Sequence, residues 1–346
     1  MAPLGLAAMF GAAGLTGAMA AVPAAAVPVA TARAASVRAA PPPATVLFTI
    51  SDDRITESSG LATSRRFKGV VYTHNDSEDD ARVFALGSDG RTKAVLTLDG
   101  AQARDWEAIA TGSDDDGRPA LYIGDIGDNL GGAWPEIWIY RILEPEELTD
   151  RTVSYQRFRF RYADGPRDAE AMLVDPGTNR IYIVSKAAGG GAFYAAPQQL
   201  STTKVNVLKK VAEAPAMVTD GAFAPDGSRI VLRDYVFAYV FVRPDNELAR
   251  LTLPVQSQGE SITYTRDGRS LLSGSEGEHA KVWKVPLPRA ALATELRTSP
   301  PAPSPAPDTT DETDALEFGG NLLAVLVAGG IGYALFRTFR GRRPAG

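Results

Sequence analysis

The sequence predicts an all-β protein, and three observations support this prediction. The chain has 346 residues, of which 33 are glycine and 24 are proline, and this content of turn formers favours many short strands over long helices. Short apolar runs alternate with turn signals such as Pro225-Asp226-Gly227 and Arg266-Asp267-Gly268. The third observation is an internal repeat, which indicates the architecture.

A similar segment occurs five times between about residues 44 and 290. Each copy opens with a polar or acidic residue and a short apolar strand. Successive openings are 48, 63, 50 and 40 residues apart. Periods of ~40–50 residues with several short strands per copy are typical of β-propellers. The five openings are Ser59–Ala62, Glu107–Ala110, Glu170–Leu173, Asp220–Phe223 and Glu260–Thr263.

Further apolar segments follow each opening and complete a small antiparallel sheet. The expected second strands are Val70–Thr73, Leu121–Ile123, Ile181–Val184, Ile230–Leu232 and Ser270–Leu272. The third strands are Val83–Leu86, Ile137–Ile142, Ala192–Ala195, Ala238–Val242 and Val282–Val285. The fourth strands are Ala94–Leu98, Val153–Tyr162, Val205–Val211 and Leu248–Leu253.

The fifth copy has no fourth strand of its own, while an unassigned apolar strand, Thr45–Ile50, precedes the first copy. We expect the N-terminal strand to complete the last sheet, because this closes the ring and leaves no open edge between the chain ends. The sequence therefore predicts a five-bladed β-propeller over residues 44–290, with six blades as the alternative.

The N-terminal segment, residues 1–39, is expected to be a signal peptide or a disordered tail. Its first 32 residues carry no charge, and they lead to two small-x-small sites, Ala32-Arg33-Ala34 and Val37-Arg38-Ala39. A signal peptide is the favoured interpretation, although the positively charged start typical of such segments is missing.

The C-terminal segment is expected to anchor the protein in a membrane. Residues 291–317 form a Pro-rich, acidic linker, and residues 318–336 carry no charge over a length that spans a bilayer at ~1.5 Å per residue. Four arginines follow within residues 337–346, which places this basic tail in the cytoplasm and the propeller outside. We therefore expect a single-pass protein of the cell membrane with an extracytoplasmic body.

The charge and the cysteine content exclude several kinds of site. The formal net charge is −5, so the chain has no basic footprint for nucleic acid. It contains no cysteine, which excludes disulfide bonds and thiolate metal sites.

Polar residues are expected to meet at one mouth of the ring, because the start of each first strand and the turn after each second strand lie on the same rim. Converging carboxylates repel one another, and hard oxygen ligands favour Ca²⁺ or Mg²⁺. The candidate metal ligands are Asp76, Glu107, Asp125, Asp128, Asn129, Glu170, Asp220 and Glu260. The candidate ligand-binding residues of the rim are His74, Asn75, Lys186, Arg233, Asp234 and Glu276.

A structural role is the alternative for the acidic residues that open the strands, since they could simply accept backbone N–H bonds. Asp76, Asp125, Asp128 and Asn129 are harder to explain in this way, because a turn needs a single Asx residue.

Two paired motifs carry a family resemblance. Ser59–Ala62 with Thr73–Ser77, and Asp105–Ala110 with Gly124–Asn129, resemble a family of secreted bacterial propellers described as WD40-like or related to esterase-like phytases. The similarity covers about residues 45–290. Propeller phytases are six-bladed and calcium-dependent with an acidic channel, so the resemblance implies a propeller with a calcium site, although the repeats here count to five.

Three classes of function remain open, and the sequence does not decide whether the protein is an enzyme. The first is a surface module that binds an extracytoplasmic ligand or acts as a scaffold. The second is a metal-assisted phosphoester hydrolase in which Lys186 and Arg233 hold phosphate. The third is a glycosidase, which needs two carboxylates about 5–9.5 Å apart.

Overall fold

The computed structural model describes residues 43–77, 79–128 and 130–292, and these residues form 21 β-strands and one short 3₁₀ helix, η1 (Arg289–Leu292). The fold is all-β, as predicted, and it resembles a propeller. The expected signal segment, most of the linker, the membrane segment 318–336 and the basic tail lie outside the described residues. Within the described part of the chain, none of the helical structure has the length and apolar character needed to cross a bilayer.

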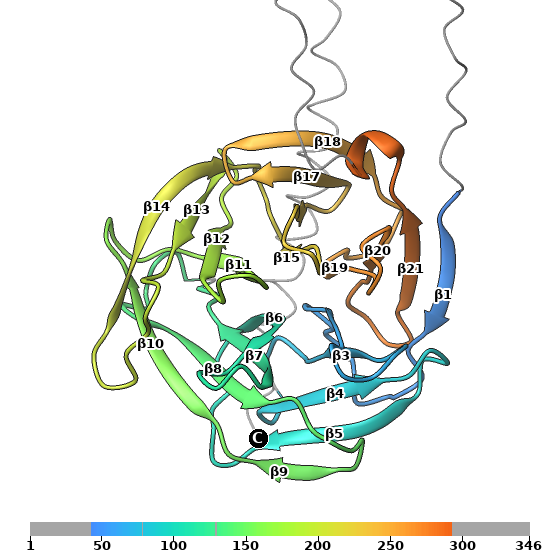
Figure 1. Ribbon diagram of the computed structural model, residues 1–346, viewed down its shortest axis with the longest axis horizontal. Helices are drawn as coiled ribbons and strands as arrows, with labels where there is room; N and C mark the ends of the chain where they lie inside the picture. The colour runs from blue at the N-terminus through green and yellow to red at the C-terminus, as the bar shows by residue number, and fades with distance from the viewer. Residues whose placement is uncertain (1–42, 78, 129, 293–346) are drawn as a thin grey trace, which may run out of the picture. The chain divides into compact units, whose positions relative to one another are not determined.

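The strands form antiparallel groups that follow one another along the chain (Figure 1), and a parallel pairing of β10 with β14 joins the second and third groups into one eight-stranded sheet. The first group contains β2 (Ala62–Thr63), β3 (Val71–Thr73), β4 (Arg82–Leu86) and β5 (Thr92–Leu98). The second contains β6 (Trp106–Ser113), β7 (Pro119–Asp125), β8 (Ile137–Leu143) and β10 (Gln156–Tyr162). The third contains β11 (Ala169–Val174), β12 (Ile181–Ser185), β13 (Gly191–Ala195) and β14 (Asn206–Ala214). The fourth contains β15 (Asp220–Phe223), β16 (Ile230–Arg233), β17 (Phe237–Arg243) and β18 (Asn246–Thr252).

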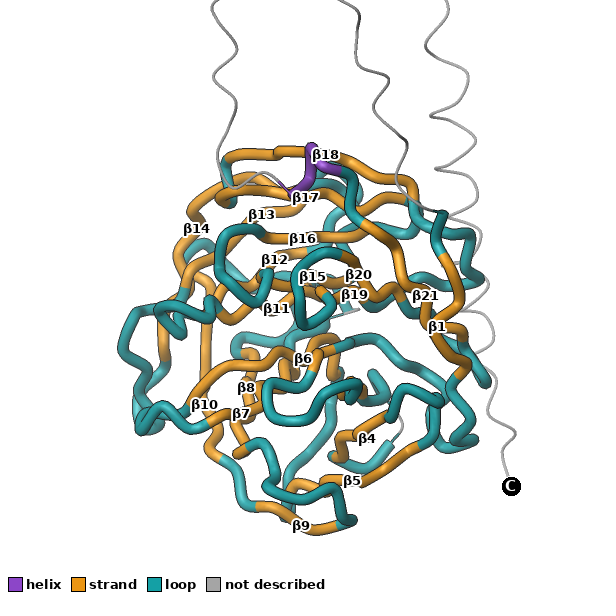
Figure 2. The backbone as a smooth tube through the Cα atoms, turned by 45° about the vertical axis from the view of Figure 1, so that its right-hand side comes forward, coloured by secondary structure: helices purple, strands orange, loops and turns teal. Residues whose placement is uncertain are grey.

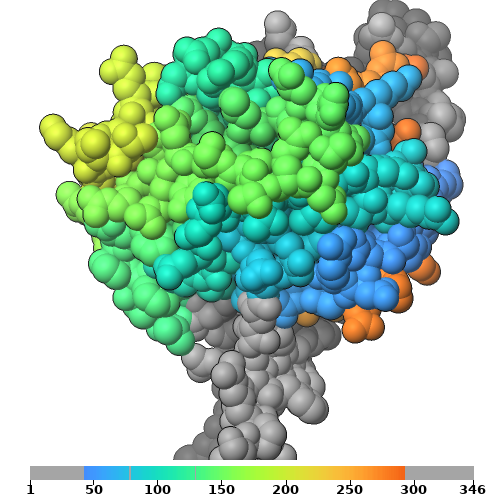
Figure 3. Space-filling view, turned by 90° about the horizontal axis from the view of Figure 1, so that it is seen from below, coloured from blue at the N-terminus to red at the C-terminus, as the bar shows by residue number. Residues whose placement is uncertain are grey.

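The last sheet has the order β1-β21-β20-β19, so the N-terminal strand β1 (Thr45–Thr49) is its outer strand. The other strands of this sheet are β19 (Ile262–Tyr264), β20 (Ser270–Ser273) and β21 (Lys281–Pro286). β1 pairs antiparallel with β21, and Ile50 N donates to Ala280 O at 2.9 Å just beyond the strand. This pairing confirms the prediction that the two ends of the propeller share one sheet. In Figure 3 the blue N-terminal and orange C-terminal residues accordingly lie side by side.

One strand assignment from the sequence was wrong. The segment Val153–Tyr162 was predicted as a single fourth strand, but it consists of β9 (Arg151–Val153) and β10. β9 pairs parallel with β5 of the first group, whereas β10 pairs antiparallel with β8 of the second. The chain changes neighbours here because it crosses from one group to the next. Such a crossing leaves no mark in the apolar pattern.

The groups are arranged in a ring. Their innermost strands contact one another in order, β2 with β6, β6 with β11, β11 with β15, β15 with β19 and β19 with β2. Figure 1 shows these strands around the centre and β18, β14, β10, β9 and β1 on the outside, and Figure 2 shows the loops that connect the strands. The apolar core is divided into clusters that lie between neighbouring groups. β11 is buried along its whole length, because it is covered on both faces.

Candidate metal centre

Carboxyl groups from several strand groups lie close enough for their charges to act on one another. Asp76 follows β3, Asp105 and Glu107 lie at the start of β6, Glu170 lies in β11, Glu260 precedes β19, and Glu276 follows β20. We call these six residues the acidic ring. Glu107, Glu170 and Glu260 are each about 5% exposed or less, so the ring lies beneath the molecular surface.

Two of these side chains lie at β-bulges. In the β6–β7 pair, Trp106 is opposite Asp125 and Ala108 is opposite Gly124, so Glu107 is the extra residue. In the β11–β12 pair, Ala169 is opposite Ser185 and Ala171 is opposite Val184, which makes Glu170 the extra residue. A bulge changes the direction of a side chain relative to the rest of its strand. The same irregularity therefore positions both glutamates in the acidic ring.

Three carboxyl groups of the ring converge. Asp76, Asp105 and Glu107 each place an oxygen within 4.8 Å of the other two. The backbone holds this arrangement, because Trp106 N donates to Asp76 O at 2.7 Å and Ile126 N donates to Asp105 O at 3.1 Å. These residues, which we call the triad, supply only oxygen ligands, as a hard cation requires.

Gly127 allows the loop after β7 to lie directly against the triad. A Cβ atom at this position would be 2.5 Å from Asp105 Oδ2 and 2.6 Å from Glu107 Oε1. Any side chain would therefore displace these carboxylates. The glycine of the Gly124–Asn129 motif is explained by this close approach, and the sequence alone did not reveal it.

The carboxyl groups of the acidic ring raise one another's pKa values. Burial raises the pKa of Glu107 well above its ordinary value, and Glu170, Asp105 and Asp76 add to the effect. Burial also raises the pKa of Glu170, and Glu260 contributes although Lys186 opposes it. The pKa of Glu276 rises to about 9, through burial and then the charges of Glu260 and Asp76.

Lys186 is the counter-ion on one side of the ring. Its ammonium group forms an ion pair with Glu170 and lies 5.4 Å from the centroid of the Tyr235 ring. Burial disfavours its charge, but Glu170 and Glu260 outweigh burial and raise its pKa well above the ordinary value. Lys186 therefore stays charged and compensates Glu170 and Glu260. Its charge also acts on Glu107 of the triad and opposes the rise in the pKa of that carboxyl group, and a bound cation would act in the same direction.

The remaining predicted metal ligands lie outside the triad. Asp125 forms a salt bridge with Arg104 at 3.0 Å, and burial raises its pKa to about 6 even though Arg104 opposes the rise. Asp220 accepts hydrogen bonds from Gly221 N and Ile262 N, each at 2.7 Å, which is the structural role weighed as the alternative. Asp128 accepts from Trp134 N at 2.7 Å. Asn129 lies outside the described residues.

Two of the predicted rim residues have structural roles. Asn75 Oδ1 accepts from Thr56 N and Glu57 N at 3.1 Å, and its amide donates to Arg54 O and Asp79. Asp234 accepts from Val236 N, Phe237 N and Tyr239 Oη, and thereby fixes the turn before β17. Both side chains therefore hold loops together.

Two other rim residues are fully buried. Arg233 links β16 to the last sheet, because its Nη1 donates to Ser261 O at 3.1 Å and to Gly274 O at 3.0 Å. His74 is packed edge-on against Trp106, with ring centroids 5.9 Å apart. Burial lowers the pKa of His74 to about 4, so its imidazole is neutral at physiological pH. Lys186 and Arg233 both act on Glu260 of the acidic ring and oppose the rise in its pKa that burial causes, and Glu276 belongs to the ring itself.

The sequence-based set of metal ligands missed Asp105. The available signal was its position among the acidic residues that open the second copy, two residues before Glu107. Tyr235 and Gln258 were also missed, although both contribute to the electrostatics of Glu260. Nothing in the sequence pattern distinguishes these two residues from ordinary loop residues.

A cavity lies at the opposite end of β6 and β7, away from the acidic ring. Its volume is about 320 Å³, and it is lined by Asp114, Asp115, Asp116, Arg118, Arg141, Ile142, Leu143, Ser154, Tyr155 and Gln156. Arg141 is paired with Asp115 at 2.6 Å. The charges in this cavity are largely compensated by Arg118 and Arg141, whereas the triad brings three carboxyl groups within 4.8 Å of one another. We therefore assign the candidate site to the acidic ring.

Comparisons with known proteins leave the family open. No family model matches the chain, and no curated protein matches it. Among solved structures, the chain is similar to a gluconolactonase from Xanthomonas campestris, with 13% sequence identity and a TM-score of 0.43. The match covers 71% of this chain and 89% of that one. We draw no functional argument from a similarity at this level.

Proposed function

We propose that the protein binds a divalent cation at the triad and acts as a surface module that binds a ligand or serves as a scaffold. The observation that supports this proposal is the convergence of Asp76, Asp105 and Glu107 to within 4.8 Å. Three carboxylates at this separation repel one another unless they take up protons or a cation. Burial and the charge of Glu170 raise the pKa of Glu107, and the charges of Asp105 and Asp76 add to the effect, which reflects the close approach of these carboxylates.

Calcium fits these ligands better than magnesium. Ca²⁺ takes about 6–8 oxygen ligands in flexible geometry, whereas Mg²⁺ demands a near-ideal octahedron. The triad offers carboxylates from two separate segments, one after β3 and one at the start of β6. A bound cation would neutralise the triad and offer open coordination positions to an anionic or hydroxyl-bearing ligand.

We expect calcium to stabilise the folded protein. A ligand that binds only the folded state adds RT ln(1 + [L]/Kd), or ~2.7 kcal/mol at 100 times Kd. Glu107→Gln keeps the shape of the side chain but removes one charge, so the calcium-dependent rise in melting temperature should shrink by more than half. Calorimetry of both proteins, in chelator and in millimolar calcium, measures the difference. Asp116→Asn is the matched control, because its carboxylate is 74% exposed at the opposite rim.

The pH dependence provides a second readout of the same site. A carboxyl whose pKa is raised on folding holds its proton longer in the folded state, so stability falls as pH rises above the unfolded value. For Glu276 this interval runs from 4.5 to about 9. In chelator, the protein should therefore melt at a lower temperature at pH 8 than at pH 5.5, and calcium should reduce that difference. A melting temperature that does not respond to calcium at pH 8 would contradict the proposed metal site.

We also propose that the protein acts outside the cytoplasm, tethered by residues 318–336. The uncharged stretch and the arginines after it support this location. Removing residues 318–346 should release a folded body into the soluble fraction, since these residues lie beyond β21, the last strand of the ring. Cell fractionation with an antibody against the body measures the release. Aggregation of the truncated protein, with loss of its β-sheet circular dichroism, would contradict the anchor.

We propose five as the number of blades, with six as the alternative. The cyclic contacts of β2, β6, β11, β15 and β19 support a count of five, because each of these strands begins one antiparallel group. The apolar clusters between neighbouring groups support the same count.

A metal-assisted hydrolase is the second candidate function. The observation that favours it is Glu107, whose pKa is raised by burial and by the charge of Glu170, while Glu170 is paired with Lys186. A carboxyl group that keeps its proton near neutral pH can serve as a general acid, and a cation can polarise a phosphoryl oxygen. Calcium-dependent hydrolysis of p-nitrophenyl phosphate, lost in Glu170→Gln, would support this function. Absence of turnover with phosphate and glycoside substrates would contradict the hydrolase and leave the binding module as the proposed function.

A further inference from the structure

A second group of oxygen atoms lies between the second and third strand groups. Asp128 is in the loop after β7, Tyr162 ends β10, and Asp168 immediately precedes β11. Asp128 N donates to Asp168 Oδ1 at 2.9 Å, which places the Asp168 carboxyl group against the backbone of Asp128. Burial raises the pKa of Asp168, and the charge of Asp128 adds to the effect. The surrounding loops are closely packed, because a Cβ atom on Gly132 would be 3.0 Å from Pro166 O.

Two buried polar atoms in this group have no hydrogen-bond partner among the described residues. They are Asp128 Oδ1 and Tyr162 Oη, on residues that are 1% and 5% exposed. The other oxygen of Asp128 accepts from Trp134 N at 2.7 Å. A buried polar group without a partner costs ~1–3 kcal/mol, so each of these atoms is a candidate to contact a bound species.

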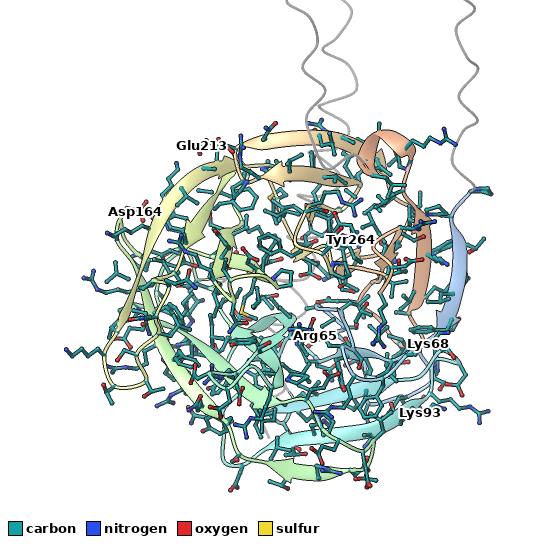
Figure 4. The ribbon with its side chains drawn as sticks, viewed as in Figure 1. Arg65, Lys68, Lys93, Asp164, Glu213 and Tyr264 are labelled. Carbon is teal, nitrogen blue, oxygen red and sulfur yellow. The ribbon has the colours of Figure 1, made fainter. Side chains whose placement is uncertain are left out.

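Tyr194, the tyrosine next to Tyr162, differs from it because its hydroxyl group has a hydrogen-bond partner. Tyr194 packs against Tyr162 with ring centroids 4.8 Å apart, and its hydroxyl donates to Asp164 Oδ2 at 3.0 Å. Figure 4 labels Asp164 at the outer edge of this sector. The hydroxyl of Tyr162 lies instead within the influence of Asp168 and Asp128, since both carboxylates add to the effect of burial in raising its pKa.

The nearby arginine does not neutralise this group by direct pairing. Arg167 lies over the Tyr162 ring, 5.2 Å from its centroid, but its guanidinium forms a salt bridge with Asp164 at 2.8 Å. The same guanidinium also donates to Gly165 O at 3.0 Å. These bonds direct the guanidinium toward Asp164 and Gly165.

We propose that Asp128, Asp168 and Tyr162 hold a second hard cation of the calcium class, separate from the one proposed at the triad. Two carboxylates and a neutral phenolic oxygen are hard ligands, and a cation would satisfy both unpartnered atoms at once. This inference rests on residues other than those of the triad.

The second site shares a loop with the triad. Asp128 directly follows Gly127, whose backbone lies against the carboxylates of Asp105 and Glu107. A cation bound to Asp128 fixes this loop, and a fixed loop holds the triad in its binding geometry. Calcium should therefore bind at the triad more weakly when the second site is lost.

The test is the number of calcium ions bound by the full-length protein, measured by equilibrium dialysis with radioactive calcium. We expect two ions per chain for the wild type and one each for Asp128→Asn and Glu107→Gln. Tyr162→Phe keeps the ring contacts with Tyr194 and Arg167, and it should weaken one of the two sites by about tenfold, equivalent to ~1.4 kcal/mol. Tyr194→Phe is the matched control and should still bind two ions with unchanged affinity.

The variants distinguish failure of the second site from failure of the triad site. One ion in the wild type that is lost in Glu107→Gln but kept in Asp128→Asn overturns the second site and leaves the triad. One ion that is lost in Asp128→Asn but kept in Glu107→Gln overturns the triad site and leaves this inference. Two ions with unchanged affinity in both Asp128→Asn and Tyr162→Phe overturn the second site. The absence of calcium binding in the wild type overturns it as well.

Discussion

Deletion of residues 44–51 is expected to abolish cooperative folding. The segment supplies β1, whose Phe48 is 6% exposed, and Ile50, which is 1% exposed. Both side chains belong to an apolar cluster that also contains Phe84 of β4 and Val282 of β21. Burying two such side chains contributes about 1.5–3 kcal/mol each, and the lost strand also exposes the edge of β21. The sum is comparable to the whole stability of a domain, about 5–15 kcal/mol.

Urea unfolding followed by circular dichroism measures this loss. Deletion of residues 1–39 is the matched control, because it removes a longer segment and leaves β1 intact. The double substitution Val46→Thr and Leu47→Thr is a second control, since these side chains are 42% and 39% exposed. Both controls should unfold at nearly the wild-type urea concentration. A cooperative transition of normal midpoint in the 44–51 deletion would show that β1 does not close the ring.

Replacement of Arg104 by methionine is expected to destabilise the protein by about 3–5 kcal/mol at pH 7, the usual effect of removing one partner of a buried ion pair. Arg104 forms a salt bridge with Asp125, whose side chain is fully buried. Its guanidinium also lies between the Trp134 and Trp138 rings, 4.4 and 4.5 Å from their centroids. Methionine fills part of this space but leaves the carboxylate without a counter-charge.

The pH dependence identifies the cause of this loss. The pKa of Asp125 is already about 6 with Arg104 present, and loss of the cation raises it further. The destabilisation should therefore be larger at pH 7 than at pH 5, where Asp125 is protonated. The double variant Arg104→Met/Asp125→Asn should recover much of the lost stability at pH 7. Equal losses at both pH values would mean that the tryptophan contacts, rather than the charge of Asp125, explain the effect.

The repeat explains how much of the fold could be predicted. The spacing of the openings and the absence of a fourth strand in the last copy were sufficient to assign Thr45–Ile50 to the last sheet, because an open edge between the chain ends is unfavourable. The crossing at Ser154 and Tyr155 was not predictable, since the apolar pattern continues through β9 and β10. The pairing partner of a strand depends on contacts far away in the sequence.

The site was predicted less completely than the fold. The sequence placed Asp76 and Glu107 together, because both belong to the same rim of the ring. It also placed Asp125 there, but Arg104, 21 residues earlier, captures that carboxylate. The bulges at Glu107 and Glu170 were not visible, because a bulge is defined by the register of two strands. The sequence therefore supplied the candidate ligands, and the pairing of the strands selected among them.

The most direct test of the triad is a crystal structure of the protein grown in calcium, with diffraction data collected at a wavelength where calcium scatters anomalously. We predict an anomalous peak between Asp76, Asp105 and Glu107, with oxygen–metal distances of about 2.3–2.6 Å. The same experiment on Glu107→Gln should give a weaker peak or none at this position. A wild-type map without a peak among these three carboxylates, at calcium concentrations that saturate binding in solution, would contradict the proposed metal centre.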